Sequence, residues 1–253
     1  MASKAPKIKA TVGGLRPIEQ YFQPIGSSLS GEIVAARSSF RMNSDKNGVI
    51  FGRDYLPILE KHTDRAAEFS SLILCQLSDT LENFSEREIS LNFISVPMTV
   101  SLLKQPAFRT KLLETVSELH LDSSKLCFEL PDTIYNESDG EAAAAIEELR
   151  RENFLFMINT YGGSASTTYR LADVPVDYVL LAAPLTQLAA AGERHASTVK
   201  SAVRLANELD TEVIATGVTN DAEGAAVSEA GCTYCIGSFI GSEVNRQYFR
   251  QNR

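Results

Sequence analysis

The side chains of this chain that could act on a substrate stand near the ends of short apolar runs. Glu129 lies at the end of one run, whereas Arg37, Asn159 and Thr216 lie near the ends of three others. In a barrel of alternating strands and helices the residues that end the strands do the chemistry, and here most of them are not carboxylates. The pattern therefore predicts a catalytic barrel without its catalytic acids.

Eight apolar runs predict the strands that position these residues. They are residues 21–25, 32–40, 89–94, 125–130, 154–159, 178–182, 212–218 and 234–239. Short, nearly continuous apolar runs are typical of strands that are covered on both faces. In a barrel of alternating strands and helices the chemistry lies at the carboxyl ends of the strands, so the residues that end the runs decide the function.

Helical periodicity separates most of these runs. Segments 63–84, 141–149 and 199–209 carry apolar side chains at helical spacing, and Pro106 divides the region 97–119 into two predicted helices. The first two runs are joined by the turn GSSLSG and therefore predict an antiparallel hairpin. We expect an α/β fold, a modified TIM-type (β/α)8 barrel with an antiparallel first strand pair.

Length and composition set the domain organisation. The 253 residues suit a single barrel of about 250 residues. Residues 1–18 hold three lysines and few large apolar side chains, so we expect a flexible N-terminal lead or linker, followed by the barrel domain over residues 19–253.

Charge and hydropathy exclude several classes of partner. The net charge of −8 disfavours nucleic acid, and no window resembles a membrane span or a secretory signal, so we expect a cytoplasmic protein without a membrane partner. The pair Cys232 and Cys235 lacks a second ligand pair and is interpreted as structural.

In chain order, the strand-end segments resemble the EAL domain, whose active members hydrolyse cyclic di-GMP on a metal-dependent barrel. The similarity covers about residues 18 to 245. The matching segments are YFQPI, GEIVAARSSFR, FELPD, INTYGGSAS, PVDYVLLA, VIATGVT and GCTYCIGSFIG. No single match is specific, but the ordered series is.

The resemblance implies a degenerate EAL domain that has lost its metal ligands and its catalytic Glu and Lys. The family's acidic or basic side chains fall on Arg37, Asn159, Thr160, Leu180, Ala182 and Thr216. We therefore expect no catalytic residue, no metal site and no cofactor. The family's Gly-rich loop falls on residues 162–168, which we interpret as a strand-to-helix connection.

Five positions keep the residue types of the family. Asn92 and Glu129 are vestigial metal-ligand types, and Gln23, Pro24 and Arg41 are vestigial nucleotide contacts. Glu129 is either a remaining ligand or the partner of Arg37 in a salt bridge, which we favour because buried charges need partners. Arg41 is either a phosphate contact or a strand-end arginine that is solvated or paired with a carboxylate.

The function expected by resemblance is a catalytically inactive EAL-like module in bacterial signalling that regulates another protein. Regulators of transcription or motility are the implied partners, and a homodimer is implied by resemblance only. The alternative is a metal-independent cyclic di-GMP receptor. Ser39 and Ile236 replace family residues on the nucleotide side and weigh against retained binding of the dinucleotide. An enzyme with different metal usage is a third, weaker interpretation.

Overall fold

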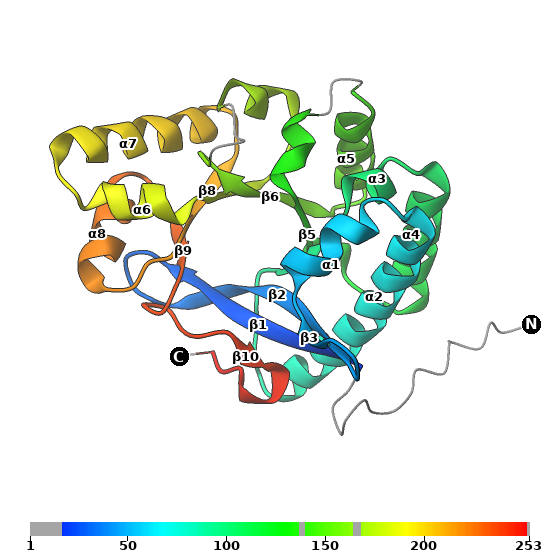
Figure 1. Cartoon of the computed structure of the whole chain (residues 1–253). Helices are drawn as coiled ribbons and strands as arrows, with labels where there is room; N and C mark the ends of the chain where they lie inside the picture. The colour runs from blue at the N-terminus through cyan, green and yellow to red at the C-terminus, as the bar shows by residue number, and fades with distance from the viewer. Residues whose placement is uncertain (1–16, 137–139, 164–167, 252–253) are drawn as a thin grey trace, which may run out of the picture.

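A ring of strands surrounded by helices forms the centre of the computed structural model, which describes residues 17–136, 140–163 and 168–251 (Figure 1). The strands are β1 (Ile18–Ser27), β2 (Ile33–Ser44), β3 (Gly48–Ile50), β4 (Ile94–Pro97), β5 (Leu126–Leu130), β6 (Leu155–Tyr161), β7 (Tyr178–Leu181), β8 (Glu212–Thr216), β9 (Tyr234–Ile236) and β10 (Val244–Asn245). They form one sheet in the order β10-β1-β9-β8-β7-β6-β5-β4-β2-β3, and the pairing of β1 with β2 closes it into a barrel.

The barrel is parallel except for its first strand. β2 and β4 to β9 pair in parallel with their neighbours, whereas β1 runs antiparallel to both β2 and β9. The predicted modified TIM-type barrel with an antiparallel first pair is confirmed. The short strands β3 and β10 were not predicted, because two or three residues are too few to show a periodicity.

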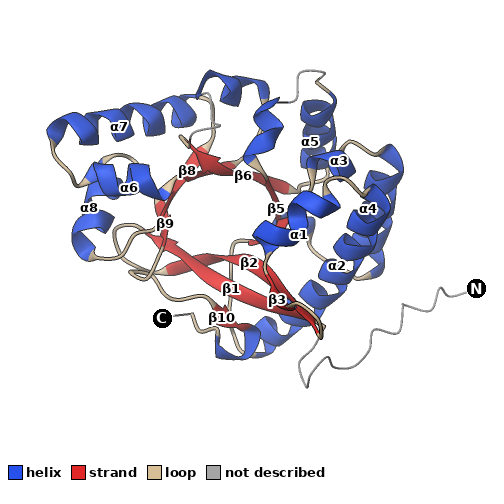
Figure 2. Ribbon diagram, viewed as in Figure 1, coloured by secondary structure: helices blue, strands red, loops and turns tan. Residues whose placement is uncertain are grey.

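The helices lie outside the ring (Figure 2). They are α1 (Gly52–Leu59), α2 (Thr63–Glu86), α3 (Val100–Leu103), α4 (Pro106–Glu118), α5 (Glu141–Arg151), α6 (Ala183–Ala189), α7 (Glu193–Glu208) and α8 (Asp221–Glu229). The predicted break at Pro106 is confirmed, since this proline begins α4, where its missing N–H needs no partner.

Two apolar cores stabilise the barrel. The larger core lies between the strands and the surrounding helices. The smaller core fills the barrel itself and consists of Ile25, Ala35, Phe93, Cys127, Met157, Leu180, Ile214 and Ile236. The ring seen in Figure 2 is therefore packed with side chains and is not a pore.

Both cysteines of the pair lie in the larger core. Cys232 and Cys235 are free and buried, and burial raises the pKa of each thiol to about 12. Both remain protonated at neutral pH, which suits packing and not redox chemistry.

One predicted strand is displaced. The run 89–94 was expected to be a strand, but β4 begins only at Ile94. Leu91 and Phe93 are buried although they precede the strand, because Leu91 packs in the larger core and Phe93 in the smaller one. An apolar run does not by itself distinguish such a buried connection from a strand.

The N-terminal lead falls mostly on residues outside the described part of the chain. The predicted division into a lead over residues 1–18 and a domain over residues 19–253 therefore stays a prediction. The first described strand, β1, begins at Ile18. Among the described residues, no helix combines the length and the apolar character needed to cross a membrane.

Candidate functional site at the rim of the barrel

The rim at the carboxyl ends of the strands gathers most of the positions singled out in the sequence. Side chains alternate along a strand, so the residues two positions beyond the interior core also point inward. These residues are Arg37, Glu129, Asn159, Ala182 and Thr216. Leu180 lies one layer deeper, in the apolar interior, and is almost fully buried.

Arg37 and Glu129 form a two-point ion pair across this rim. Nε of Arg37 donates to Oε2 of Glu129 at 2.8 Å, and Nη2 donates to Oε1 at 2.5 Å. The strand register places Arg37 level with Ser95 and Cys127, two residues short of Glu129, and the long arginine side chain spans the difference. The predicted salt bridge is confirmed.

The two charges interact strongly because both side chains are largely buried. The Glu129 side chain is 9% exposed and that of Arg37 is 30% exposed. The charge of Glu129 raises the pKa of Arg37 above its ordinary value, although burial of the guanidinium acts in the opposite direction. A bidentate arginine and carboxylate pair is among the stronger polar contacts in proteins, and it fixes the geometry of both groups.

The remaining rim residues do not form a donor set for divalent cations. The Asn159 amide oxygen accepts from Thr160 Oγ1 at 3.1 Å, and Thr216 Oγ1 donates to the backbone oxygen of Leu181 at 2.7 Å. Within the described ranges, no group of three or more His, Cys, Asp or Glu side chains could hold a metal ion. The rim residues therefore do not fit the two metal ions of the active family.

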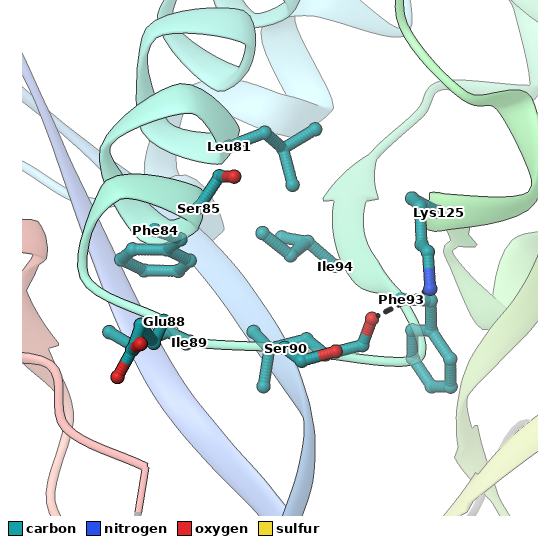
Figure 3. Close-up of a pocket in the computed structure, with 10 residues that line it drawn as sticks. Leu81, Phe84, Ser85, Glu88, Ile89, Ser90, Phe93, Ile94 and Lys125 are labelled. Carbon is teal, nitrogen blue, oxygen red and sulfur yellow. Dashed lines mark hydrogen bonds between the residues drawn. The ribbon is translucent and has the colours of Figure 1, made fainter.

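Asn92 does not join the rim, and its assignment as a vestigial ligand is corrected. It is exposed, precedes β4, and its backbone N–H donates to the oxygen of Val34. Its neighbours Leu91 and Phe93 line a cavity of about 300 Å³ at the amino-terminal end of the barrel, where Lys125 donates to the Leu91 oxygen (Figure 3). Pro97, and not Asn92, lies beside Glu129 in the sheet.

The vestigial nucleotide contacts lie on β1 and β2. Gln23 is half-buried opposite Arg37, and Pro24 is buried. Nη2 of Arg41 donates to Oε2 of Glu243 at 2.6 Å, and its guanidinium lies 3.6 Å from the centre of the Tyr21 ring. Arg41 is therefore paired with a carboxylate, one of the two alternatives left open by the sequence.

A cleft of about 350 Å³ opens beside the ion pair, between α1 and the carboxyl ends of β4 and β5. Its apolar lining comes from Leu56, Pro57, Pro97, Met98, Leu130 and Pro131. Glu129 and Asn159 line it as well. On the same side of the molecule, Val49, Phe51 and Ile58 are 45%, 40% and 53% exposed.

Sequence reasoning missed both α1 and Glu243. The apolar run YLPIL was the available signal for α1, but Pro57 inside it argued against a helix. Glu243 lies 202 residues from Arg41, and nothing local marks it as a partner.

Thr160 adopts an unusual backbone conformation at the rim, with a φ of +64°. Asn and Asp tolerate this left-handed region, whereas a β-branched residue is strained there. The resemblance assigns this position to an Asp of the family, a residue type that tolerates this conformation better than Thr does. Residues 164–167 of the following loop lie outside the described part of the chain.

A family model described as the EAL domain matches residues 16–243. The chain is 23% identical over 251 residues to the cyclic di-GMP phosphodiesterase RocR of Pseudomonas aeruginosa, and this match covers 98% of the chain and 63% of RocR. It is 22% identical over 205 residues to the cyclic di-GMP phosphodiesterase PdeL of Escherichia coli, and this match covers 78% of the chain and 54% of PdeL. The chain thus spans less than two thirds of either protein.

The fold has close structural relatives. The structure of the EAL enzyme Bd1971 with cAMP and cyclic di-GMP bound superposes with a TM-score of 0.79 at 18% identity, over 91% of this chain and 63% of that one. At this identity the likeness concerns the fold alone.

The ion pair predicts a coupled loss of stability. We expect Arg37→Ala and Glu129→Ala each to lower the free energy of unfolding by about 2 kcal/mol, less than for a fully buried pair because Arg37 is partly exposed. The double variant should lose clearly less than the sum, since neither charge is then left unpaired. Urea unfolding of the four proteins measures this, and additive losses would contradict it.

The strained threonine predicts a stabilising substitution. Thr160→Asn should raise the free energy of unfolding by about 1 kcal/mol, because Asn adopts a positive φ more readily. Thr110→Asn on the exposed face of α4 is the matched control and should change stability little, as Thr and Asn have similar helix propensities. Equal effects of both substitutions in urea unfolding would show that the backbone of Thr160 is not strained.

Proposed function

The chain belongs to the EAL domain family of cyclic di-GMP signalling proteins, and we propose that it is a catalytically inactive member that regulates another protein by binding it. The observation that carries the proposal is the ion pair between Arg37 and Glu129. A permanently charged guanidinium stands at the position that the resemblance assigns to a metal-binding carboxylate.

The pair opposes hydrolysis in two ways. Arg37 repels a divalent cation, and two of its N–H groups occupy both carboxylate oxygens of Glu129. Leu180, Ala182 and Thr216 offer no general base near the pair, because none of these side chains accepts a proton at neutral pH. Metal binding and proton transfer are therefore both unsupported at this rim.

The surface around α1 supports binding of another protein. Phe51 and Ile58 are large apolar side chains that are 40% and 53% exposed, and they flank the mostly apolar cleft beside Glu129. Exposed apolar groups gathered beside a cleft are typical of interaction sites. A regulator of transcription or motility is the partner that the resemblance implies, and a homodimer remains a proposal on the same basis.

A metal-independent cyclic di-GMP receptor is the second candidate. Arg41 favours it, because an arginine at this position contacts a phosphate in the family that the chain resembles. The pairing of Arg41 with Glu243 weighs against it, since the carboxylate already occupies the guanidinium.

The first test concerns catalysis. We expect no turnover of cyclic di-GMP above the blank with Mg²⁺ or Mn²⁺, and an unfolding temperature that EDTA does not change, because the rim lacks a donor set for these ions. Product analysis by chromatography and thermal unfolding measure the two quantities. Turnover that disappears in Glu129→Gln would overturn the proposal.

The second test concerns the partner. The tagged chain should capture a specific protein from a lysate of its own source organism, and Ile58→Asp should abolish the capture by placing a charge on the apolar surface. Leu29→Asp is the matched control, because Leu29 is 83% exposed in the turn between β1 and β2, at the opposite end of the barrel. Capture that survives Ile58→Asp would exclude the α1 surface, and no capture at all would count against a regulatory module.

A further inference from the structure

The inward face of β2 carries a row of hydrogen-bond donors. Arg37, Ser39 and Arg41 occupy alternate positions of this strand and therefore share one face, beyond the apolar interior of the barrel. Two guanidinium groups with a hydroxyl between them are well suited to bind oxyanions.

Within the described part of the chain, two carboxylates contact this row. Glu129 accepts both of its hydrogen bonds from Arg37, whereas Glu243 accepts from the Ser39 hydroxyl and from Arg41. Glu243 also contributes to the raised pKa of Arg37, after the larger contribution of Glu129. Its carboxylate therefore acts on the whole row.

The two carboxylates are held to different degrees. Glu129 belongs to β5, is 9% exposed and forms a two-point contact. Glu243 lies in the segment between β9 and β10, is 32% exposed, and uses only one nitrogen of Arg41. Glu243 can therefore leave its arginine at a smaller loss of free energy than Glu129 can, because exposed ion pairs contribute little.

Arg41 is prepared for a larger anion than a carboxylate. Its Nε is buried and finds no hydrogen-bond partner among the residues that the structure describes. The Tyr21 ring, 3.6 Å from the guanidinium, holds the group in place independently of Glu243. Nη2, the free Nε and the Ser39 hydroxyl together offer three donors, which a phosphate group with several oxygens satisfies better than the two oxygens of Glu243.

We propose, building on the second candidate function, that Glu243 is an internal competitor. It occupies the arginine that contacts a phosphate in the family, so a phosphate-bearing ligand reaches Arg37, Ser39 and Arg41 only by displacing the Glu243 carboxylate. The apparent affinity for such a ligand is the intrinsic affinity multiplied by the fraction of molecules in which Glu243 has left the site. Removing the charge of Glu243 opens the site and also removes a repulsion against the incoming anion.

The experiment compares wild type with Glu243→Gln and Glu243→Ala in calorimetric titrations at constant ionic strength. The probes are inorganic phosphate and cyclic di-GMP, which separate a general phosphate site from one for a phosphodiester. Both variants should bind at least one probe about fivefold more tightly than wild type does, the factor that corresponds to an exposed ion pair.

Two further variants decide the cause of any gain. Glu86→Gln removes the same charge from an exposed position on α2 and should bind as wild type does. Adding Arg41→Ala to Glu243→Gln should abolish the gain. The proposal is overturned if both Glu243 variants bind no better than Glu86→Gln, or if the gain survives without Arg41. Neither result affects the proposed inactivity or the α1 surface, which are tested by other measurements.

Discussion

The ion pair between Arg37 and Glu129 is the constraint on which the rim of this barrel depends. Glu129 is a carboxylate with 9% of its side chain exposed, and a buried charge of this kind must have a partner of opposite sign. Arg37 supplies that partner from β2, 92 residues away in the sequence, and so ties two strands of the barrel together at their carboxyl ends. A positive charge built into the chain thus neutralises Glu129 without any bound ion.

The residues near this pair at the end of β7 are apolar. Leu180 lies in the apolar interior with Met157 and Ile214, and Ala182 is buried above it. The resemblance assigns a Lys and an Asp of the family to these two positions, and with apolar side chains there the packed interior extends toward the rim. Burying apolar groups in place of charged ones favours folding. The backbone of Thr160 is the exception, because a β-branched residue there adopts a left-handed conformation that suits Asp or Asn better.

Hydrophobic periodicity made most of the fold predictable from the sequence. The register of the strands and the contacts between distant residues were not predictable. The break at Pro106 follows from local chemistry, and the antiparallel first pair follows from a short turn between two apolar runs. Asn92 was misplaced because the apolar side chains of Leu91, Phe93, Ile94 and Val96 extend across the start of β4, and such a pattern does not reveal where pairing begins. Glu243 was missed because its partners lie more than 200 residues earlier, at a distance over which sequence patterns carry no signal.

The two arginines of β2 have different roles. The contact of Arg37 stabilises the barrel, whereas the contact of Arg41 is the one proposed to open for a ligand. Arg37 holds a carboxylate of the barrel wall at two points, so this contact belongs to the fold. Arg41 holds a carboxylate of a connecting segment at one nitrogen. The ring centres of Tyr21 and Phe51 lie 3.6 and 5.6 Å from its guanidinium. Phe51 also belongs to the exposed apolar surface beside α1. The exchangeable contact therefore borders the surface proposed for a partner, so an anion that displaced Glu243 would change the charge at the edge of that surface while leaving the barrel intact.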